Sequence, residues 1–425
     1  MVFLLDDIKE FKKESYLNNF ILIIFILMPI FLIIGTMVSE IAVIISCFIF
    51  LYNFFKNKEN IFNDNLFYFF LLIYFSLIVN FIYSINPTNS FLRNIFFIKY
   101  IIFCLGSVKF LSNKKYRLFF IFKLWSIILI LFSIDLFIQY FLGKNIIGLE
   151  SPLKFHRVSG FMGDELKAGS LILNIALISS AYIINTKNKN LGFVFLIFFL
   201  SSIFITGDRS NFLKSIIIII SLFFIFDRTY IKKISLLFLL LTFFISLTLT
   251  TNPVYKIRYG NDLFGLLKNN NYNLIKYVYN TEYGKLYYTG YELFINNQLF
   301  GVGNKNFRAL CDKKFTEKLI RDFSEKKENL RCNTHPHQVY FEIMSEHGIL
   351  GLIILLVMLT IFIKDNLGFI YKKKNLLLTL QFLIILSVFI PILPGGSFFT
   401  SFNATLFWMN FIFFYAYKRI LIKNV

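Results

Sequence analysis

The chain has 425 residues, of which 57% are hydrophobic and only 16% are charged, and its formal net charge at pH 7 is +20. Too little polar side chain is present to cover a soluble globule, so the composition excludes a soluble domain and indicates a protein that crosses a membrane several times. The apolar segments run continuously instead of alternating at every second residue, which excludes a β-barrel.

Twelve apolar runs follow one another along the chain, and each is close to the ~20 residues that one helical crossing requires. They cover residues 18–36, 37–55, 65–84, 95–111, 118–142, 168–186, 191–206, 211–227, 234–251, 339–363, 375–392 and 404–417. The sequence therefore predicts an all-α polytopic membrane protein with about 12 transmembrane helices, surrounded by membrane lipids.

The connections between these runs alternate in charge. One set is rich in Lys and Arg, including 9–13, 56–58, 114–117, 187–189, 228–233, 372–374 and 418–419, whereas the other short connections contain only Arg93 and Arg209. Because basic loops are retained in the cytoplasm, we expect both termini to be cytoplasmic. The same rule accounts for most of the net charge, so no nucleic-acid partner is expected.

Two connections on the opposite, outward side are longer. The first covers 144–167, and the second is the 86-residue segment 252–337 between the ninth and tenth runs, which divides the chain into 1–251, 252–337 and 338–425. Long ordered loops are usually functional. The middle part of the segment 252–337, at 281–296, has the periodicity of an amphipathic helix. The loop carries fourteen Lys and Arg against eight Asp and Glu, and the retention of basic loops in the cytoplasm does not explain this excess on the opposite side.

Two cysteines, Cys311 and Cys332, lie in this long loop, on the side of the membrane where disulfides persist. A bridge between them would close a loop of about 22 residues and contribute ~3 kcal/mol; the alternative is two unpaired thiols. A metal site is disfavoured, because the spacing is not Cys-x-x-Cys and only His335 and His337 lie nearby.

Several polar residues are predicted at one depth, on the outward boundary of the membrane. They are Arg157 before the sixth run, Arg209 in the turn between the seventh and eighth, and His335 and His337 at the start of the tenth. Arginine binds phosphate through two parallel hydrogen bonds, and histidine can accept a proton near neutral pH. Together they favour a reaction on a phosphate-linked substrate in the outer leaflet.

Roles without a function in catalysis or binding are also compatible with three of these residues. Arg157 fits a lipid-headgroup contact, His335 fits a turn shaped with Pro336, and His337 fits a helix-start residue bonded to the backbone. His347 and the nearby Gly348 and Gly351 are expected at helix contacts. Lys99 and Asp135 are both predicted inside spans, where a buried ion pair is favoured and a cation lining the path of a lipid-linked substrate is the alternative.

Four motifs resemble those of the bacterial O-antigen ligase and polymerase superfamily. Thr334-His-Pro-His-Gln-Val-Tyr-Phe-Glu-Ile-Met-Ser-Glu-His-Gly-Ile-Leu-Gly351 resembles its His-Pro-His-Asn…Glu-x-Gly-x-x-Gly signature, and Gly301-Val-Gly-Asn-Lys-Asn-Phe307 its preceding Gly-x-Gly…Phe element. Thr206-Gly-Asp-Arg-Ser210 is similar to its Thr-x-Ser-Arg-Ser turn, and Arg157-Val-Ser-Gly-Phe161 to its Arg-x-x-Gly-x-Phe segment. All four occur in the family's order.

The resemblance implies glycosyl transfer on the periplasmic face of the inner membrane, from an undecaprenyl-diphosphate-linked glycan to an acceptor hydroxyl, without metal or cofactor. His337 matches the family's histidine, and Arg209 its diphosphate-contacting arginine. Where the family often has a further arginine followed by Trp, the nearest residues here are Lys285 and Tyr288. Lys285, Arg157 and His335 are therefore the candidate substrate-binding residues. Asp208 and Gln338 replace a common Ser and Asn.

Four assignments of the function remain, and the first two differ in the acceptor. A ligase would use lipid A-core, which we favour, and a polymerase would use another lipid-linked repeat unit. A lipid-linked oligosaccharide flippase or transporter would also have about twelve helices and cationic cavities, but is expected to place its charges near the membrane midplane. A non-catalytic partner of other glycan-assembly membrane proteins would not need His337.

Overall fold

The computed structural model describes residues 2–58, 64–151, 157–185, 189–226, 228–265, 273, 278, 280–310 and 331–423. These residues are helical and contain no β-strand, and the one bridge among them, Lys144 to Glu150, is isolated. The predicted all-α class is thus confirmed for the described part of the chain.

Each predicted apolar run coincides with helical structure, and seven of the described helices are long and apolar enough to cross a membrane. The helices are α2 (Tyr16–Ile34), α3 (Thr36–Asn57), α4 (Asn65–Ile82), α5 (Pro87–Ile95) with α6 (Ile98–Asn113), α7 (Lys115–Leu142), α8 (Ala168–Leu171) with η2 (Ile172–Ala176) and α9 (Leu177–Ile184), α10 (Lys189–Ile205), α11 (Arg209–Phe223), α12 (Arg228–Thr251), α19 (Val339–Lys373), α20 (Leu376–Ser387) and α21 (Ser401–Lys423). The protein is multi-pass, while the count of twelve crossings and their orientation stay predictions.

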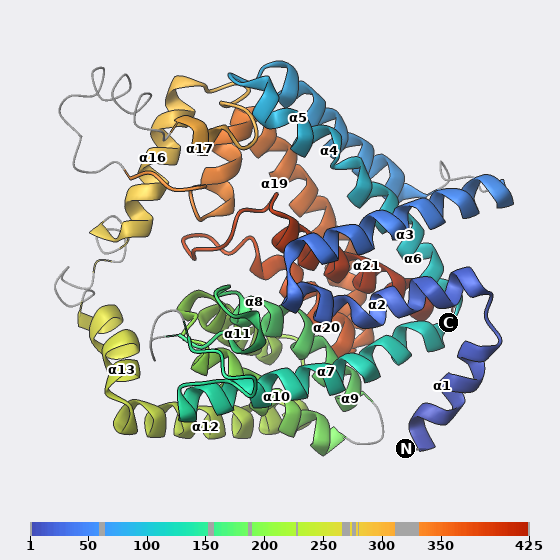
Figure 1. The fold of residues 1–425 in the computed structure, drawn as a ribbon, viewed down its shortest axis with the longest axis vertical. Helices are drawn as coiled ribbons and strands as arrows, with labels where there is room; N and C mark the ends of the chain where they lie inside the picture. Colours follow the sequence, from blue (N-terminus) through green and yellow to red (C-terminus); the bar gives the residue numbers. More distant parts are fainter. Residues whose placement is uncertain are drawn as a thin grey trace.

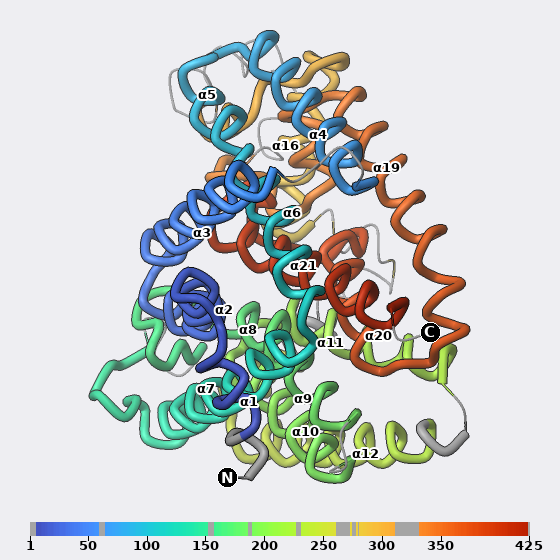
Figure 2. The backbone as a smooth tube through the Cα atoms, turned by 90° about the vertical axis from the view of Figure 1, so that its right-hand side faces the viewer, coloured from blue at the N-terminus to red at the C-terminus, as the bar shows by residue number. Residues whose placement is uncertain are grey.

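Helix α21 occupies the interior of the bundle, where it packs against α3, α6, α7 and α20 (Figure 2). Its Phe413 ring lies 5.9 Å from the Phe25 ring, 5.3 Å from that of Phe122 and 5.0 Å from that of Trp125. Lipid tails are as apolar as these side chains, so close packing of rings, rather than escape from water, holds such helices together.

The segments outside the predicted spans gather at two ends of the bundle. Both termini, with α1 (Val2–Lys12), lie at one end, whereas α13 (Pro253–Tyr255), α16 (Glu282–Asn296) and α17 (Asn306–Leu310) lie at the other (Figure 1). Helix α16 confirms the amphipathic helix predicted at 281–296, and Thr281 caps it by accepting a 3.0 Å hydrogen bond from Gly284 N.

Helix α19 is broken at Gly348, whose φ of 66° and ψ of −162° are not helical. The chain at Gln298 to Gly303 fills the break: Val302 N donates to Ser345 O at 2.9 Å, and Ile349 N donates to Gln298 O at 2.7 Å. Irregular backbone inside a membrane bundle requires such partners, because lipid offers none. Gly348 therefore contacts this loop, and the expectation that it contacts a neighbouring helix is wrong.

A buried amide network holds the same loop against α4 and α5. Asn80 Nδ2 donates to Glu346 O at 2.7 Å and to Phe300 O at 3.1 Å. Its Oδ1 accepts from Asn304 N at 3.0 Å and from Asn94 Nδ2 at 2.9 Å. The Gly-x-Gly element thus has a structural role, since it joins α4, α5 and α19 at one end of the bundle.

The predicted ion pair between Lys99 and Asp135 is wrong. Lys99 Nζ instead pairs with Glu40 on α3, and Asp135 Oδ1 accepts a 2.9 Å hydrogen bond from Ile146 N. The expected depth of a residue in the membrane does not reveal which helices are neighbours. Lys99 reaches Glu40 because α6 packs extensively against α3.

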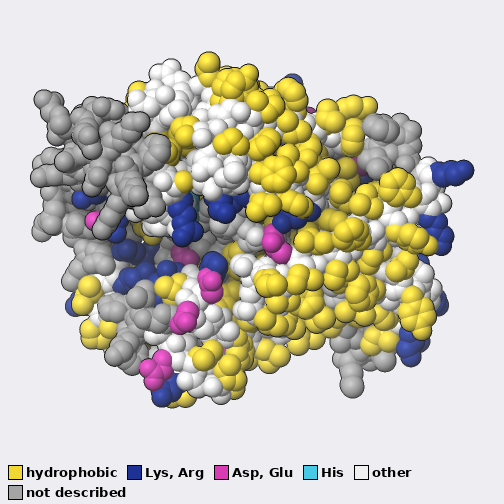
Figure 3. Space-filling view, turned by 45° about the horizontal axis from the view of Figure 1, so that its top comes forward, with side chains coloured by type: hydrophobic (Ala, Val, Ile, Leu, Met, Phe, Trp, Pro, Cys, Tyr) yellow, Lys and Arg dark blue, Asp and Glu magenta, His cyan; other side chains and the backbone are white. Residues whose placement is uncertain are grey.

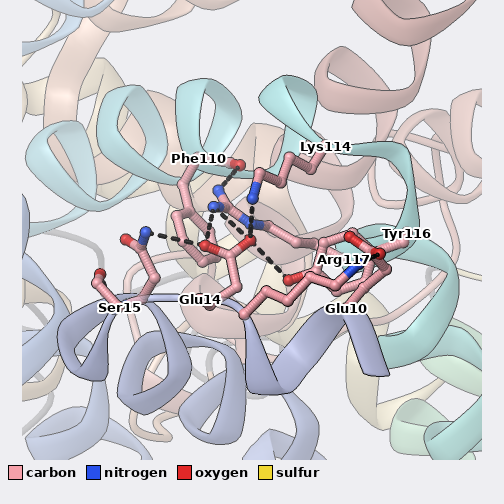
Figure 4. A network of polar contacts seen from close by, with 9 residues as sticks. Glu10, Glu14, Ser15, Phe110, Lys114, Tyr116 and Arg117 are labelled. Atoms are coloured by element: carbon pink, nitrogen blue, oxygen red, sulfur yellow. Dashed lines mark hydrogen bonds and ion pairs between the residues drawn. The ribbon is translucent and has the colours of Figure 1, made fainter. Parts of the chain in front are cut away.

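An ionic network joins the segment after α1 to α7 (Figure 4). Both Nε and Nη2 of Arg117 donate to Glu14 at 2.8 to 3.0 Å, Tyr116 Oη donates to it at 2.6 Å, and Lys114 Nζ lies 3.0 Å away. Burial acts to raise the pKa of Glu14, but these hydrogen bonds lower it from its ordinary 4.5 to about 2.

Glu14→Gln should lower the free energy of unfolding by about 3 kcal/mol at neutral pH, because Arg117 would lose its buried counter-ion. Chemical unfolding in detergent measures the change. Glu10→Gln is the matched control, since its exposed pair with Lys13 is worth about 0.5 kcal/mol or less.

The sign of the pH dependence follows from the lowered pKa. The advantage of the wild type over Glu14→Gln is fully present above about pH 4.5 and is lost as the pH falls toward about 2. An advantage that persists at the lowest pH would contradict the ionic role of Glu14.

Gly348→Ala should destabilise the protein by about 2–4 kcal/mol, because a Cβ would lie 2.5 Å from Leu299 O and the positive φ disfavours alanine. Gly368→Ala in the same helix is the control: nothing lies within 4 Å of its Cβ, so it should stabilise by about 0.5–1 kcal/mol. Equal effects of the two substitutions, measured by thermal unfolding, would refute the tight contact at the break.

Candidate active site

An open cavity of about 1090 Å³ lies between segments that are distant in the chain. Its walls come from α3, α5, α6, the turn before α11, the start of α19 and the connection between α20 and α21. Figure 3 shows the molecule hollowed where Lys, Arg, Asp and Glu side chains gather beside a broad hydrophobic surface. Among the described residues, five basic side chains line the cavity against two acidic ones: Arg93, Lys99, Arg157, Lys167 and Lys214, with Glu40 and Asp208.

His335 and His337 both line this cavity, and their ring centroids lie 4.0 Å apart. His335 is fixed at both nitrogens, by Thr334 Oγ1 at 2.9 Å and by Gly395 O at 3.4 Å. His337 Nε2 lies 3.1 Å from Asn333 Nδ2, which can only donate, so this nitrogen is unprotonated and its lone pair faces a donor.

The backbone of His337 has a φ of 60°, a left-handed conformation that few non-glycine residues adopt. Gly395 N donates a 2.7 Å hydrogen bond to His337 O and helps to hold this conformation. Such strain is maintained where the surrounding structure requires it, and it is frequent at functional sites.

Both imidazoles are neutral at physiological pH. Burial lowers the pKa of His335 to about 4, and nearby Arg93 adds to the effect. Burial, and then the neighbouring His335, lower the pKa of His337 to about 4. A neutral His337 can accept a hydrogen bond or a proton from a hydroxyl group.

Three arginines gather at the turn before α11. Arg157 Nη2 lies 3.5 Å from Asp208 Oδ2, and Arg209 Nη1 donates to Arg258 O at 3.1 Å. Arg258 Nε donates in turn to Gly207 O at 2.8 Å. Burial, followed by the positive charges of Arg209 and Arg157, lowers the pKa of Arg258.

A short connection joins the arginine turn to the histidines. Ser210 Oγ donates to Pro394 O, and the next residue, Gly395, bonds both His335 and His337. The start of α11 and the segment before α19 are therefore both hydrogen-bonded to the turn at Pro394 and Gly395.

The predicted site residues are brought together only in part. Arg157, His335 and His337 line the cavity, whereas Arg209 stands between the lining residues Asp208 and Ser210 without lining the cavity itself. Lys285 on α16 is not among the lining residues, although Tyr283 on the same helix is. Cys311 lies outside the described residues, so its disulfide with Cys332 stays a prediction.

Sequence reasoning missed Arg258 and Lys214. Arg258 lies just after α12, at the same boundary used to select Arg157, so the boundary argument could have found it. Lys214 is an ionisable residue inside an apolar run, which is itself a sign of function. Within the described part of the chain, no group of three or more His, Cys, Asp or Glu side chains is placed to hold a metal ion.

Residues 193–356 match the family model described as O-antigen ligase. The match includes the turn with Arg209 and the motif with His337, and it confirms the resemblance to the O-antigen ligase and polymerase superfamily; Arg157 lies outside it. Among curated proteins, no match was found.

Proposed function

We propose that this chain, a multi-pass membrane protein that resembles the O-antigen ligase and polymerase superfamily, transfers a glycan from undecaprenyl diphosphate to a lipid A-core acceptor. The observation that carries the proposal is that a neutral, strained His337 lines the same basic cavity as Arg157. The family match over both the arginine turn and the histidine motif adds to it. The reaction would take place at the periplasmic face of the inner membrane.

The donor's diphosphate fits the basic side of the cavity. Arg157 and the turn with Arg209 supply guanidinium groups, which stay protonated and bind phosphate through parallel hydrogen bonds. Such charges stabilise the negative charge that develops on a departing diphosphate. Lys285 remains a candidate for a later step of substrate binding from α16.

The donor's lipid chain fits the opposite wall. Phe48 on α3, together with Leu92, Phe96 and Ile98 around α5 and α6, lines the cavity while being 42 to 68% exposed. Exposed apolar side chains at the rim of a polar cavity suit an isoprenoid that stays in the bilayer while its head group enters.

The chemical step is a displacement at the anomeric carbon with inversion. His337 Nε2 accepts the proton of the acceptor hydroxyl, whose oxygen forms the new bond to the anomeric carbon. The bond from that carbon to the diphosphate oxygen breaks, and undecaprenyl diphosphate leaves with the electron pair. Asn333, now bonded to Nε2 in the protein alone, gives way to the acceptor hydroxyl. His335 keeps the neighbouring ring in place.

His337→Asn should reduce glycan transfer by at least about 100-fold while leaving membrane insertion and thermal stability nearly unchanged. Asparagine tolerates the positive φ at this position, so the backbone is preserved while the base is lost. Transfer is measured with purified protein, a lipid-linked donor and a lipid A-core acceptor. Wild-type turnover in this variant would refute the role of His337, and it would favour a non-catalytic partner.

The pH profile provides a second measurement on the same assay. Since the pKa of His337 is about 4, the base is already neutral at physiological pH. kcat/KM should therefore be flat from about pH 8 to about pH 5 and should fall as the pH drops through 4.

The acceptor is tested by the lipopolysaccharide pattern of a deletion strain. If the protein is a ligase, its deletion causes lipid-linked polymer to accumulate and leaves no polymer on the core, which is the expected result. A core capped by a single repeat unit would instead indicate a polymerase. Loss of lipid-linked glycan from the periplasmic side would indicate a flippase or transporter.

A further inference from the structure

Lys214 lies on α11, just over one turn after Arg209, and lines the cavity while its side chain is only 7% exposed. Within the described residues it has neither a hydrogen bond nor an ion pair. The nearest acidic group that acts on it is Asp208. The oxygens of Asp208 already accept from Asn211, at 3.2 and 2.8 Å, and face Arg157.

Three of the other four basic side chains of the cavity differ from Lys214 in this respect. Lys99 pairs with Glu40, Arg157 with Asp208, and Lys167 with Glu165 at 2.6 Å. Arg93 has no ion pair in the described part of the chain either, but it is only half-buried.

A buried ammonium without a counter-ion costs free energy, and proteins retain such a group mainly where an anion arrives. A second donor of the cavity is in the same state: Arg157 Nε is buried and has no hydrogen-bond partner among the described residues. Two unsatisfied cationic donors that belong to residues of one cavity, each near Asp208, are a suitable environment for a phosphate group.

The position of Lys214 links it to the histidines. A Cβ added to Gly395 would lie 3.5 Å from Lys214 Nζ, and Gly395 is the residue whose backbone bonds His335 and His337. An anion held by Nζ would thus lie close to the residue that bonds the base, in the same cavity as His337.

We propose that Lys214 and Arg157 Nε form a phosphate subsite that binds the diphosphate of the donor. The inference rests on the proposed function and names the cation that supplements Arg209. The shared chemistry is a phosphate group, which could also come from a phosphorylated acceptor such as lipid A. Lysine holds phosphate as a point charge, so it can follow the diphosphate as the bond breaks.

Lys214→Met tests the subsite, and Lys167→Met is the matched control, because Lys167 lines the same cavity but is already paired. Binding is followed in purified protein by the thermal shift with farnesyl diphosphate, a short donor analogue. Lys214→Met should weaken binding by about tenfold or more, and Lys167→Met by no more than about twofold.

Without ligand, Lys214→Met should raise the melting temperature, because methionine fills the same space without a buried charge. A lysine with a structural role would instead lower the melting temperature when it is replaced. Lys214→Gln is the second variant: it should also lose farnesyl diphosphate binding, and unchanged binding in both variants would overturn the proposal.

A parallel titration with lipid A separates the two sources of phosphate. Loss of farnesyl diphosphate binding with normal lipid A binding assigns Lys214 to the donor, whereas loss confined to lipid A overturns the donor assignment. If the wild type transfers no glycan but Lys214→Met still loses farnesyl diphosphate binding, the proposed function fails and the subsite stands. If the wild type transfers glycan and Lys214→Met matches it in binding and turnover, only the subsite fails.

Discussion

The lack of water in the bilayer interior is the constraint on which the rest of this structure depends. Each polar group placed there needs a partner from the protein itself. The break in α19 at Gly348 exists only because the chain from Gln298 to Gly303 supplies its hydrogen bonds, and Asn80 fixes that chain to α4. The polar backbone groups at this end of the bundle are thus hydrogen-bonded within the protein. They support the first part of α19, which directly follows the two histidines.

The charged side chains of the cavity fall into two groups, those with a counter-ion and those without enough negative charge nearby. Lys99 is paired with Glu40, whereas Asp208 is the acidic residue that faces Arg157 and acts on Lys214, so among the described residues this part of the cavity, with Arg258 nearby, has an excess of positive charge. This concentration of positive charge raises the free energy of the protein alone, and it stabilises the complex once an anion is bound. The neutral imidazoles across the short Pro394–Gly395 connection do not add to this charge, so the base remains available beside a strongly cationic wall.

The sequence predicted the helical segments well, because long apolar runs report directly on burial in lipid. The motifs predicted that Arg157 and His337 share a site, since their order and boundary position are local properties. Contacts between distant segments were beyond such reasoning. The partner of Lys99 depended on α3 lying beside α6, and the contact of Gly348 depended on a loop about fifty residues earlier in the chain. Lys214 could have been flagged as a charge in an apolar run, but its place in the cavity required coordinates.

The connection at Pro394 and Gly395 has a mechanical consequence. Its backbone bonds Ser210 at the start of α11 and His337 before α19, so two hydrogen bonds link these two helix starts through one short connection. A widening of the cavity that moved the arginine turn away from the histidines would therefore have to break the hydrogen bond from Ser210 to Pro394 O or the one from Gly395 N to His337 O.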